Sequence, residues 1–580
     1  MPQGFAELLS RNAADLGLIL PEVMVALAFI FGLVVELALP AKDAENAERR
    51  KTGTYVLLIG LLLALWINVN DMKAYVGSLD QAVTIYSTGR DGATVTVTRN
   101  TDMTSQDFIY SKMVVRDSFG TFVKFVLLLG TIVTVLVALN AKELESNGRG
   151  EFILLLAATC LGGMFLASST NLLMLYLSLE SLSIVSYAMA GFLRGDRKSS
   201  EAGLKYVMYG AMASGIMIFG ISYLYGLTGT LNLDEVAAHF RGMEAGHAPH
   251  TRGALAAVLA MVFAGLLYKI AAVPFHYWAP DVYEGAPTTA TGFFSVVPKA
   301  AGFAVLVRVI AAFFPIGDID DQGFNFVTAE KVLTVVAILT MTIGNLAALG
   351  QSNAKRMLAY SSIAHAGYML AGLAALSNAN GAAAVLFYLV VYLLMNLGAF
   401  LVLVALENVR GSCDLDKLRG TIRREPLLGT ALVIFLFSLT GMPPLAGFIG
   451  KYLIMLELAS AGNWLLVVVM GLNSVISLYY YMRLAKAVAI DAPGETPVSG
   501  ESNPPVLGVL AVGKVAMLLA LFVWFEPVQK LCQQVMVPLL PSVDERFVAK
   551  PDAGSAVQDE ARLTPAPSPE HLAATPEPER

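Results

Sequence analysis

The sequence predicts an all-α membrane protein with about fourteen helices that span the bilayer. Of its 580 residues, 56% are hydrophobic and only 14% are charged, whereas soluble domains carry roughly 25% charged residues. The apolar residues fall into blocks of about 20 residues or more, the length that a helix needs to cross a hydrocarbon core about 30 Å thick. An ordinary soluble enzyme is therefore excluded.

Fourteen such blocks follow one another along the chain. In order, the expected spans are 16–39, 54–69, 117–139, 152–169, 171–193, 202–227, 254–273, 290–314, 331–350, 356–376, 382–407, 428–458, 463–488 and 505–524. The first block is too long for the apolar region of a signal peptide, and no small-residue cleavage site follows it. Most loop lysines and arginines follow odd-numbered spans, which places those loops in the cytoplasm and both termini outside.

These spans divide the chain into five expected parts. They are an N-terminal three-helix segment (1–143), a first five-helix unit (152–314), a second five-helix unit (331–488), a last transmembrane helix (505–524) and a tail (541–580). The first part includes a long external loop, 70–116, in which residues 93–98 alternate as in a strand. The tail contains seven prolines and eight acidic residues, a composition that predicts disorder.

Several predicted spans contain an ionisable side chain, most of them near the middle of the membrane. Such a group costs about 2.5–3.5 kcal/mol on insertion scales, so each one is a functional hypothesis. The candidates are Glu180, Lys205, Lys269, Lys299, His365 and Lys451. One alone would be consistent with a structural ion pair or a satisfied core histidine, but their recurrence in one chain favours proton movement.

Three further charged residues are interpreted differently. Arg308 is expected to be structural or lipid-facing, and Lys124 and Lys514, whose long side chains could reach a membrane interface, are left out of the candidate set.

The chemistry of the six candidates suits a proton path. Burial disfavours the charged form of a lysine, and a nearby carboxylate restores it, so a Lys–Glu pair can change its proton affinity. Histidine has an ordinary pKa of about 6.5 and relays protons at physiological pH after a small shift. A metal site is not expected, because the histidines lack acidic or cysteine companions at ligand spacing.

Redox and nucleotide chemistry are expected in other chains. The three cysteines, Cys160, Cys413 and Cys532, are isolated, and no GxGxxG or P-loop motif precedes a helix. No run of lysine and arginine indicates nucleic-acid binding.

Prolines interrupt the seventh and twelfth spans. Pro274 follows Lys269, and Pro443 and Pro444 precede Lys451; each proline removes a backbone donor from the helix. Because the two spans are five apart, they cross the membrane in opposite directions, as the halves of an inverted repeat do. We therefore expect spans 4–8 and 9–13 to form two inverted five-helix repeats with broken helices 7 and 12.

Three motifs resemble those of the proton-translocating, antiporter-like membrane subunits of respiratory complex I. They are PFHYWAPDVYEGAPT at 274–288, AYSSIAHAGY at 359–368 and GMPPLAGFIGKY at 441–452, and the resemblance covers roughly residues 16–525. One group of paralogues has a glutamate where Lys451 stands, and another continues into a long lateral helix where this chain continues into a polar tail. The loop 70–116 and the tail depart from the usual pattern of the family.

The resemblance implies a role for each matched residue. Glu180 would be the carboxylate that modulates Lys269 on broken helix 7. Lys299 would be the central lysine, linked through water and His365 to Lys451, which would face the outer exit.

The resemblance also implies partners and a location. Glu201 and Lys205 would lie near the cytoplasmic uptake side or in the charge relay to a neighbouring subunit. NADH, FMN, iron–sulfur clusters and quinone would bind in partner subunits, with no cofactor or metal in this chain. The chain would contact the lipid bilayer, other membrane-arm subunits and, indirectly, the NADH-oxidising arm, in the bacterial inner membrane. An Mrp-type cation/proton antiporter remains the main alternative, whereas a passive membrane scaffold conflicts with the buried charges.

Overall fold

The computed structural model describes residues 15–38, 44–80, 108–145, 148–243, 249–314, 326–375, 379–493 and 503–539. All of them belong to one compact unit, made of residues 1–82 and 100–540. The second compact unit, residues 83–99 and 541–580, lies outside the described residues. The strand expected at 93–98 and the tail expected at 541–580 therefore stay predictions.

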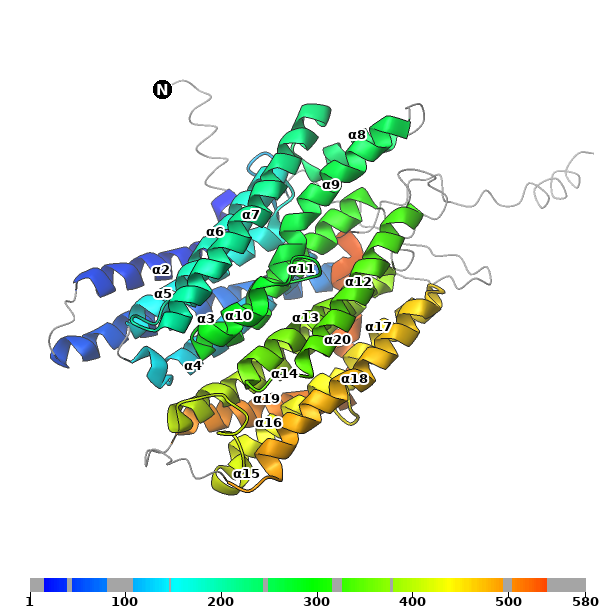
Figure 1. Cartoon of the computed structure of the whole chain (residues 1–580). Coiled ribbons are helices and arrows are strands. Elements are labelled where there is room, and N and C mark those ends of the chain that lie inside the picture. The colour runs from blue at the N-terminus through cyan, green and yellow to red at the C-terminus, as the bar shows by residue number, and fades with distance from the viewer. Residues whose placement is uncertain are drawn as a thin grey trace, which may run out of the picture. The chain divides into compact units, whose positions relative to one another are not determined.

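The described residues are almost entirely helical (Figure 1). Up to the end of predicted span 8, the helices are α2 (Leu20–Ala38), α3 (Ala44–Asp80), α4 (Ser118–Ala138), η1 (Lys142–Leu144), α5 (Arg149–Ser168), α6 (Leu172–Ala190), α7 (Arg197–Thr228), α8 (Leu233–Met243), α9 (Pro249–Ile270), α10 (Trp278–Gly285) and α11 (Thr288–Phe313). The later helices are α12 (Phe326–Ala348), α13 (Ala354–Ala374), α14 (Ala379–Arg410), α15 (Thr421–Arg424), α16 (Pro426–Thr440), α17 (Ala446–Ser460), α18 (Trp464–Ala489), α19 (Pro505–Val523), α20 (Glu526–Met536) and η2 (Val537–Leu539).

Within the described residues, eleven helices are long and apolar enough to cross a membrane, which confirms the predicted class of polytopic all-α membrane protein. Two of the remaining predicted spans contain the shorter apolar helices Ala256–Ile270 and Pro426–Thr440. The third is α13, a full-length helix that carries Lys355, Arg356 and His365. The exact number of crossings stays a prediction.

The segment predicted as the external loop 70–116 is partly helical, because α3 continues to Asp80. A small antiparallel hairpin does occur, but it pairs β1 (Phe108–Ile109) with β2 (Val114–Val115). The side chain of Arg116 reaches Asp71 of α3 at 2.6 Å, so the hairpin is tied to the end of that helix.

Both spans that contain internal prolines are interrupted, as predicted. The first break lies between Ile270, the last residue of α9, and Trp278, the first of α10. The second lies between Thr440 of α16 and Ala446 of α17. Gly441 follows α16 with φ +88°, a left-handed conformation that glycine adopts without strain.

Two matched contacts support the predicted inverted repeats. Asn171 at the start of α6 pairs with Asn232 just after α7, and Asn353 at the start of α13 pairs with Asp414 just after α14. The amide nitrogen donates at 2.8 Å in the first pair and at 2.9 Å in the second. The second pair follows the first by 182 positions at both ends (171 to 353 and 232 to 414). The same local link therefore joins α6 to α7 and α13 to α14.

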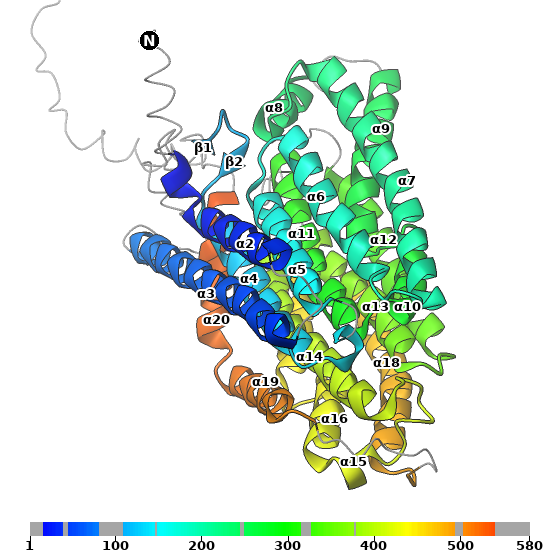
Figure 2. The same cartoon turned by 90° about the vertical axis from the view of Figure 1, so that its left-hand side faces the viewer.

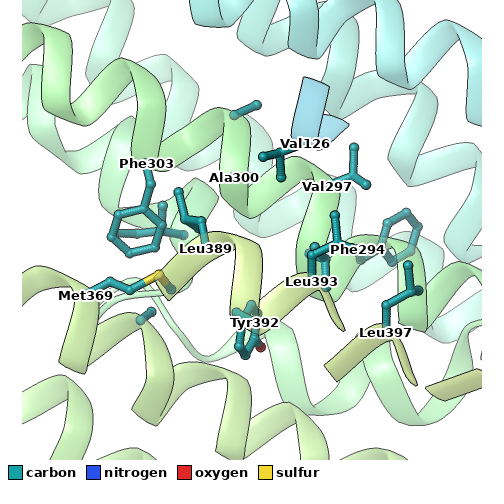
Figure 3. Close-up of a cluster of buried hydrophobic side chains, with 14 of the residues drawn as sticks. Val126, Phe294, Val297, Ala300, Phe303, Met369, Leu389, Tyr392, Leu393 and Leu397 are labelled. Atoms are coloured by element: carbon teal, nitrogen blue, oxygen red, sulfur yellow. The ribbon is translucent and has the colours of Figure 1, made fainter. Parts of the chain in front are cut away.

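The long helix α14 lies in the centre of the packing. It contacts α11, α13, α16, α17 and α19, and its leucines meet α11 in an apolar layer. Figure 3 shows Leu393 and Leu397 of α14 beside Phe294 and Val297 of α11. Helices α2 and α3 pack side by side, and α3 also contacts α4 (Figure 2).

Candidate functional site

The central lysine of α11 lies inside the protein and contacts α13. Lys299 is only 1% exposed. Its Nζ donates to the carbonyl oxygen of Ser362 at 2.9 Å and to the Ser362 hydroxyl at 2.5 Å. The hydroxyl of Tyr392 on α14 also donates to Ser362, at 2.9 Å. The lysine is thus joined to a hydroxyl pair rather than to a carboxylate.

Both ring nitrogens of His365 are held by tyrosines. The imidazole is 1% exposed, with Nδ1 2.6 Å from the hydroxyl of Tyr388 and Nε2 3.1 Å from the hydroxyl of Tyr481. The Tyr481 hydroxyl also lies 2.5 Å from that of Ser361. Because Ser361 precedes Ser362, the Lys299 and His365 contacts meet on one turn of α13.

Lys451 of α17 lies at the break between α16 and α17, which is the break in predicted span 12. Lys451 is 4% exposed and donates to the carbonyl oxygen of Thr440, the last residue of α16, at 2.9 Å. Its Nζ also lies over the ring of Tyr368 on α13, 4.7 Å from the ring centre. A cation is favoured at this place, because the C-terminal end of a helix carries partial negative charge.

Lys269 of α9, in predicted span 7, is buried near the predicted glutamate, Glu180. Lys269 is 1% exposed and donates to the hydroxyl of Ser183 on α6 at 3.1 Å. Glu180, three residues before Ser183, is close enough to interact electrostatically with Lys269. The Glu180 Oε1 atom is buried and has no hydrogen-bond partner within the described part of the chain. The two groups are therefore neighbours without a direct ion pair.

Lys205 belongs to a separate, half-exposed charge network. It pairs with Glu201 at 2.8 Å and with Asp281 of α10 at 2.6 Å. Arg356 of α13 bridges Asp281 at 2.7 Å and Glu284 at 3.0 Å. The half-helix α10 is thereby joined to α7 on one side and to α13 on the other.

The partners of the candidate residues were not predicted from the sequence. Asp281 and Glu284 lie inside the first quoted motif, three residues apart, a spacing that places both on one face of a helix. Tyr388 and Tyr392 show the equivalent four-residue spacing on α14. These spacings indicate which residues share a face of one helix. They do not indicate which residues of other helices that face contacts.

The three charged residues outside the candidate set are also buried. Lys124 and Lys514 are 4% and 5% exposed, and Lys124 pairs with Glu22 of α2 at 2.6 Å. Arg308 is structural rather than lipid-facing. Its guanidinium donates two hydrogen bonds of 2.8 Å to the Asp117 carboxylate.

Comparison with known proteins identifies the family of the chain. Residues 169–477 match the family described as NADH:quinone oxidoreductase/Mrp antiporter, TM. The NADH-quinone oxidoreductase subunit N of Anaeromyxobacter sp. (strain Fw109-5) is 45% identical over 437 residues, which cover 72% of this chain and 83% of the relative.

Solved structures show the same fold. A chain of respiratory complex I from Thermus thermophilus is 33% identical with a TM-score of 0.67, covering 88% of this chain and 98% of that one. A chain of the Mrp complex from Dietzia sp. DQ12-45-1b shares the fold, with a TM-score of 0.69, 20% identity and coverage of 90% and 98%. The chain belongs to the NADH-quinone oxidoreductase subunit N family of antiporter-like membrane proteins.

Proposed function

We propose that this chain carries protons across the bacterial inner membrane as part of an NADH:quinone oxidoreductase, while NADH, FMN, iron–sulfur clusters and quinone bind in partner subunits. The proton-carrying residues would be Glu180, Lys205, Lys269, Lys299, His365 and Lys451. The placement of His365 carries this proposal, because it contacts hydroxyl groups through both ring nitrogens in the region between Lys299 and Lys451.

An imidazole in this setting can pass a proton from one nitrogen to the other. A neutral histidine holds one N–H and one lone pair, so a proton accepted on one side leaves a different proton free to depart on the other. Tyr388 also lies against the helix of Lys451. A Cβ added at Gly450 would lie 2.4 Å from a ring carbon of Tyr388. Water can bridge the remaining gaps at small entropic cost.

In the first repeat, the interaction between Glu180 and Lys269 would control proton transfer. Movement of Glu180 toward or away from Lys269 would change the proton affinity of the lysine, because a carboxylate favours its charged form. The aliphatic stem of Lys269 lies against α11 at Gly302, where a Cβ would be 3.4 Å from Lys269 Cγ. Gly302 is less than one helical turn from Lys299. A change in the protonation of Lys269 therefore occurs beside α11, the helix that carries Lys299.

The test compares two lysine variants in the whole enzyme, in inverted membrane vesicles. Lys451→Met should lower NADH-driven acidification of the vesicle interior, whereas Lys486→Met, at an exposed lysine of α18, should not. Equal acidification by both variants would contradict the proposal. The Mrp-type alternative differs in its partners, so copurification of the chain with NADH-oxidising subunits distinguishes the two.

A further inference from the structure

One face of α14 continues from the Lys299 site toward α10 and carries a buried polar residue, Asn396, that the path described above does not use. Tyr392, Asn396 and Phe400 follow one another at intervals of four residues and share this face. The Tyr392 hydroxyl donates to Ser362 of α13, and the Phe400 ring lies 6.4 Å from the ring of Tyr283 on α10. Asn396 lies between these contacts and therefore faces α10 and α13.

Two side chains in this region lack hydrogen bonds. Asn396 is fully buried, and neither its amide nitrogen nor its amide oxygen has a partner among the described residues. The buried hydroxyl of Tyr283 approaches Ser362 but also has no partner with hydrogen-bond geometry in that part of the chain. Buried polar groups of this kind are normally satisfied by internal water.

The same face of α14 ends in a carboxylate. Glu407 follows Asn396 by eleven residues, about three turns or 16 Å, and its Oε2 is buried without a partner among the described residues. It interacts electrostatically with Glu143 of η1. Burial raises the pKa of the Glu143 carboxyl, and the nearby Glu407 charge raises it further; Lys355 of α13 and the hydrogen bonds from the backbone of Thr289 and Thr288 lower it only in part, so this pair favours holding a proton.

Glu143 also marks the beginning of α11. Its carboxylate accepts hydrogen bonds of 2.9 Å from the backbone nitrogens of Thr288 and Thr289. Thr288 precedes Lys299 by eleven residues, again about 16 Å along the helix. Between them, Gly292 lies against α14, where a Cβ would be 2.9 Å from the Cβ of Phe400. The carboxylates and Lys299 thus lie at two ends of one stretch of packed α11 and α14.

We propose that Glu143 and Glu407 form a proton-uptake site, and that a hydrated column past Tyr283 and Asn396 connects it to Lys299. This inference rests on the proposed function and adds the route by which protons reach the central lysine. In the predicted orientation, this end of the bundle faces the cytoplasm. The O–H bond of a protonated carboxyl breaks, water carries the proton, and an N–H bond forms at the neutral Lys299 amine; the carboxylate is reprotonated from the cytoplasm.

The test uses three variants in the whole complex in inverted vesicles. Asn396→Leu removes the polar group and fills its place, Asn396→Ser keeps a hydroxyl and leaves room for water, and Thr134→Val is a matched loss of a buried hydroxyl on α4. We expect severalfold slower proton translocation in Asn396→Leu, with rates near the parent in the other two, at equal amounts of assembled complex. Equal rates in Asn396→Leu and Asn396→Ser would overturn the column.

Two further variants separate this inference from the proposed function. Glu407→Gln keeps the shape of the side chain but cannot carry the proton, and should slow translocation as Asn396→Leu does. Lys299→Met tests the function itself. If Lys299→Met abolishes translocation while Glu407→Gln and Asn396→Leu leave it unchanged, the uptake route is wrong and the function stands. If Lys299→Met has no effect, the proposed function fails.

Discussion

The hydroxyl oxygen of Tyr388 lies 2.6 Å from Nδ1 of His365 and fixes one side of the buried imidazole. The ring of the same tyrosine packs against Gly450, the residue before Lys451. Tyr388 therefore contacts both the histidine on α13 and the helix of the second lysine. Removing the hydroxyl changes the first contact and leaves the second in place.

Tyr388→Phe should reduce proton translocation while the complex still assembles. The variant frees Nδ1, so the imidazole loses one of the two contacts that orient it and select its tautomer. The measurement is the rate of NADH-driven acidification per assembled complex. Tyr480→Phe is the control, because that buried tyrosine donates to Asn345 instead. Identical rates in both variants would show that the Tyr388 hydroxyl has no role in transfer.

Glu180→Gln should lower translocation by removing the charge that acts on Lys269. Glutamine has the shape of glutamate but cannot supply a negative charge, so the charged form of Lys269 loses its stabilisation. The expected result is slower proton transfer with an unchanged amount of complex. Glu151→Gln, at a half-exposed glutamate on α5, provides the comparison. A Glu180→Gln enzyme that pumps at the parent rate would exclude this control step.

Arg356→Ala should uncouple α10 from α13 with little cost in stability. The ion pairs with Asp281 and Glu284 are partly exposed, and such pairs contribute about 0–1 kcal/mol. Translocation should fall nonetheless, because α10 is the half-helix beside Lys269. The assay compares translocation with thermal stability of the purified complex. A variant that loses both in proportion would indicate a structural role only.

Arg308→Leu should destabilise the subunit by about 3–5 kcal/mol, because it leaves the buried Asp117 carboxylate without its partner. The amount of assembled complex after mild heating measures this loss. The double variant Arg308→Leu with Asp117→Asn should recover much of it, since no buried charge remains unpaired. Failure of the double variant to recover would show that the loss arises from packing around the guanidinium instead.

The sequence predicted the class of fold, and simple depth arguments predicted the burial of the central candidate residues. Lys299 and His365 each lie nine residues beyond the expected start of a span, about 14 Å at 1.5 Å per residue, and both are buried. The breaks next to Lys269 and Lys451 were visible because proline removes a backbone donor. These features depend on one helix at a time.

Contacts between helices were not predictable in the same way. Tyr481 reaches His365 from 116 positions away, and nothing in the spacing of either helix indicates the pairing. The position of Lys124 in its span would let the side chain reach an interface, but the side chain pairs with Glu22 on α2 inside the bundle. Asn396 is an unremarkable amide in an apolar sequence, and only the burial of both its polar atoms without partners makes it a candidate.

The most direct test of proton conduction through this chain is the number of protons translocated per NADH oxidised by the Lys299→Met enzyme. We expect a lower ratio than in the parent enzyme, with Lys486→Met unchanged, because protons can no longer pass between the two halves of the path. An unaltered ratio in fully assembled Lys299→Met complex would contradict the claim that this chain conducts protons through its buried lysines.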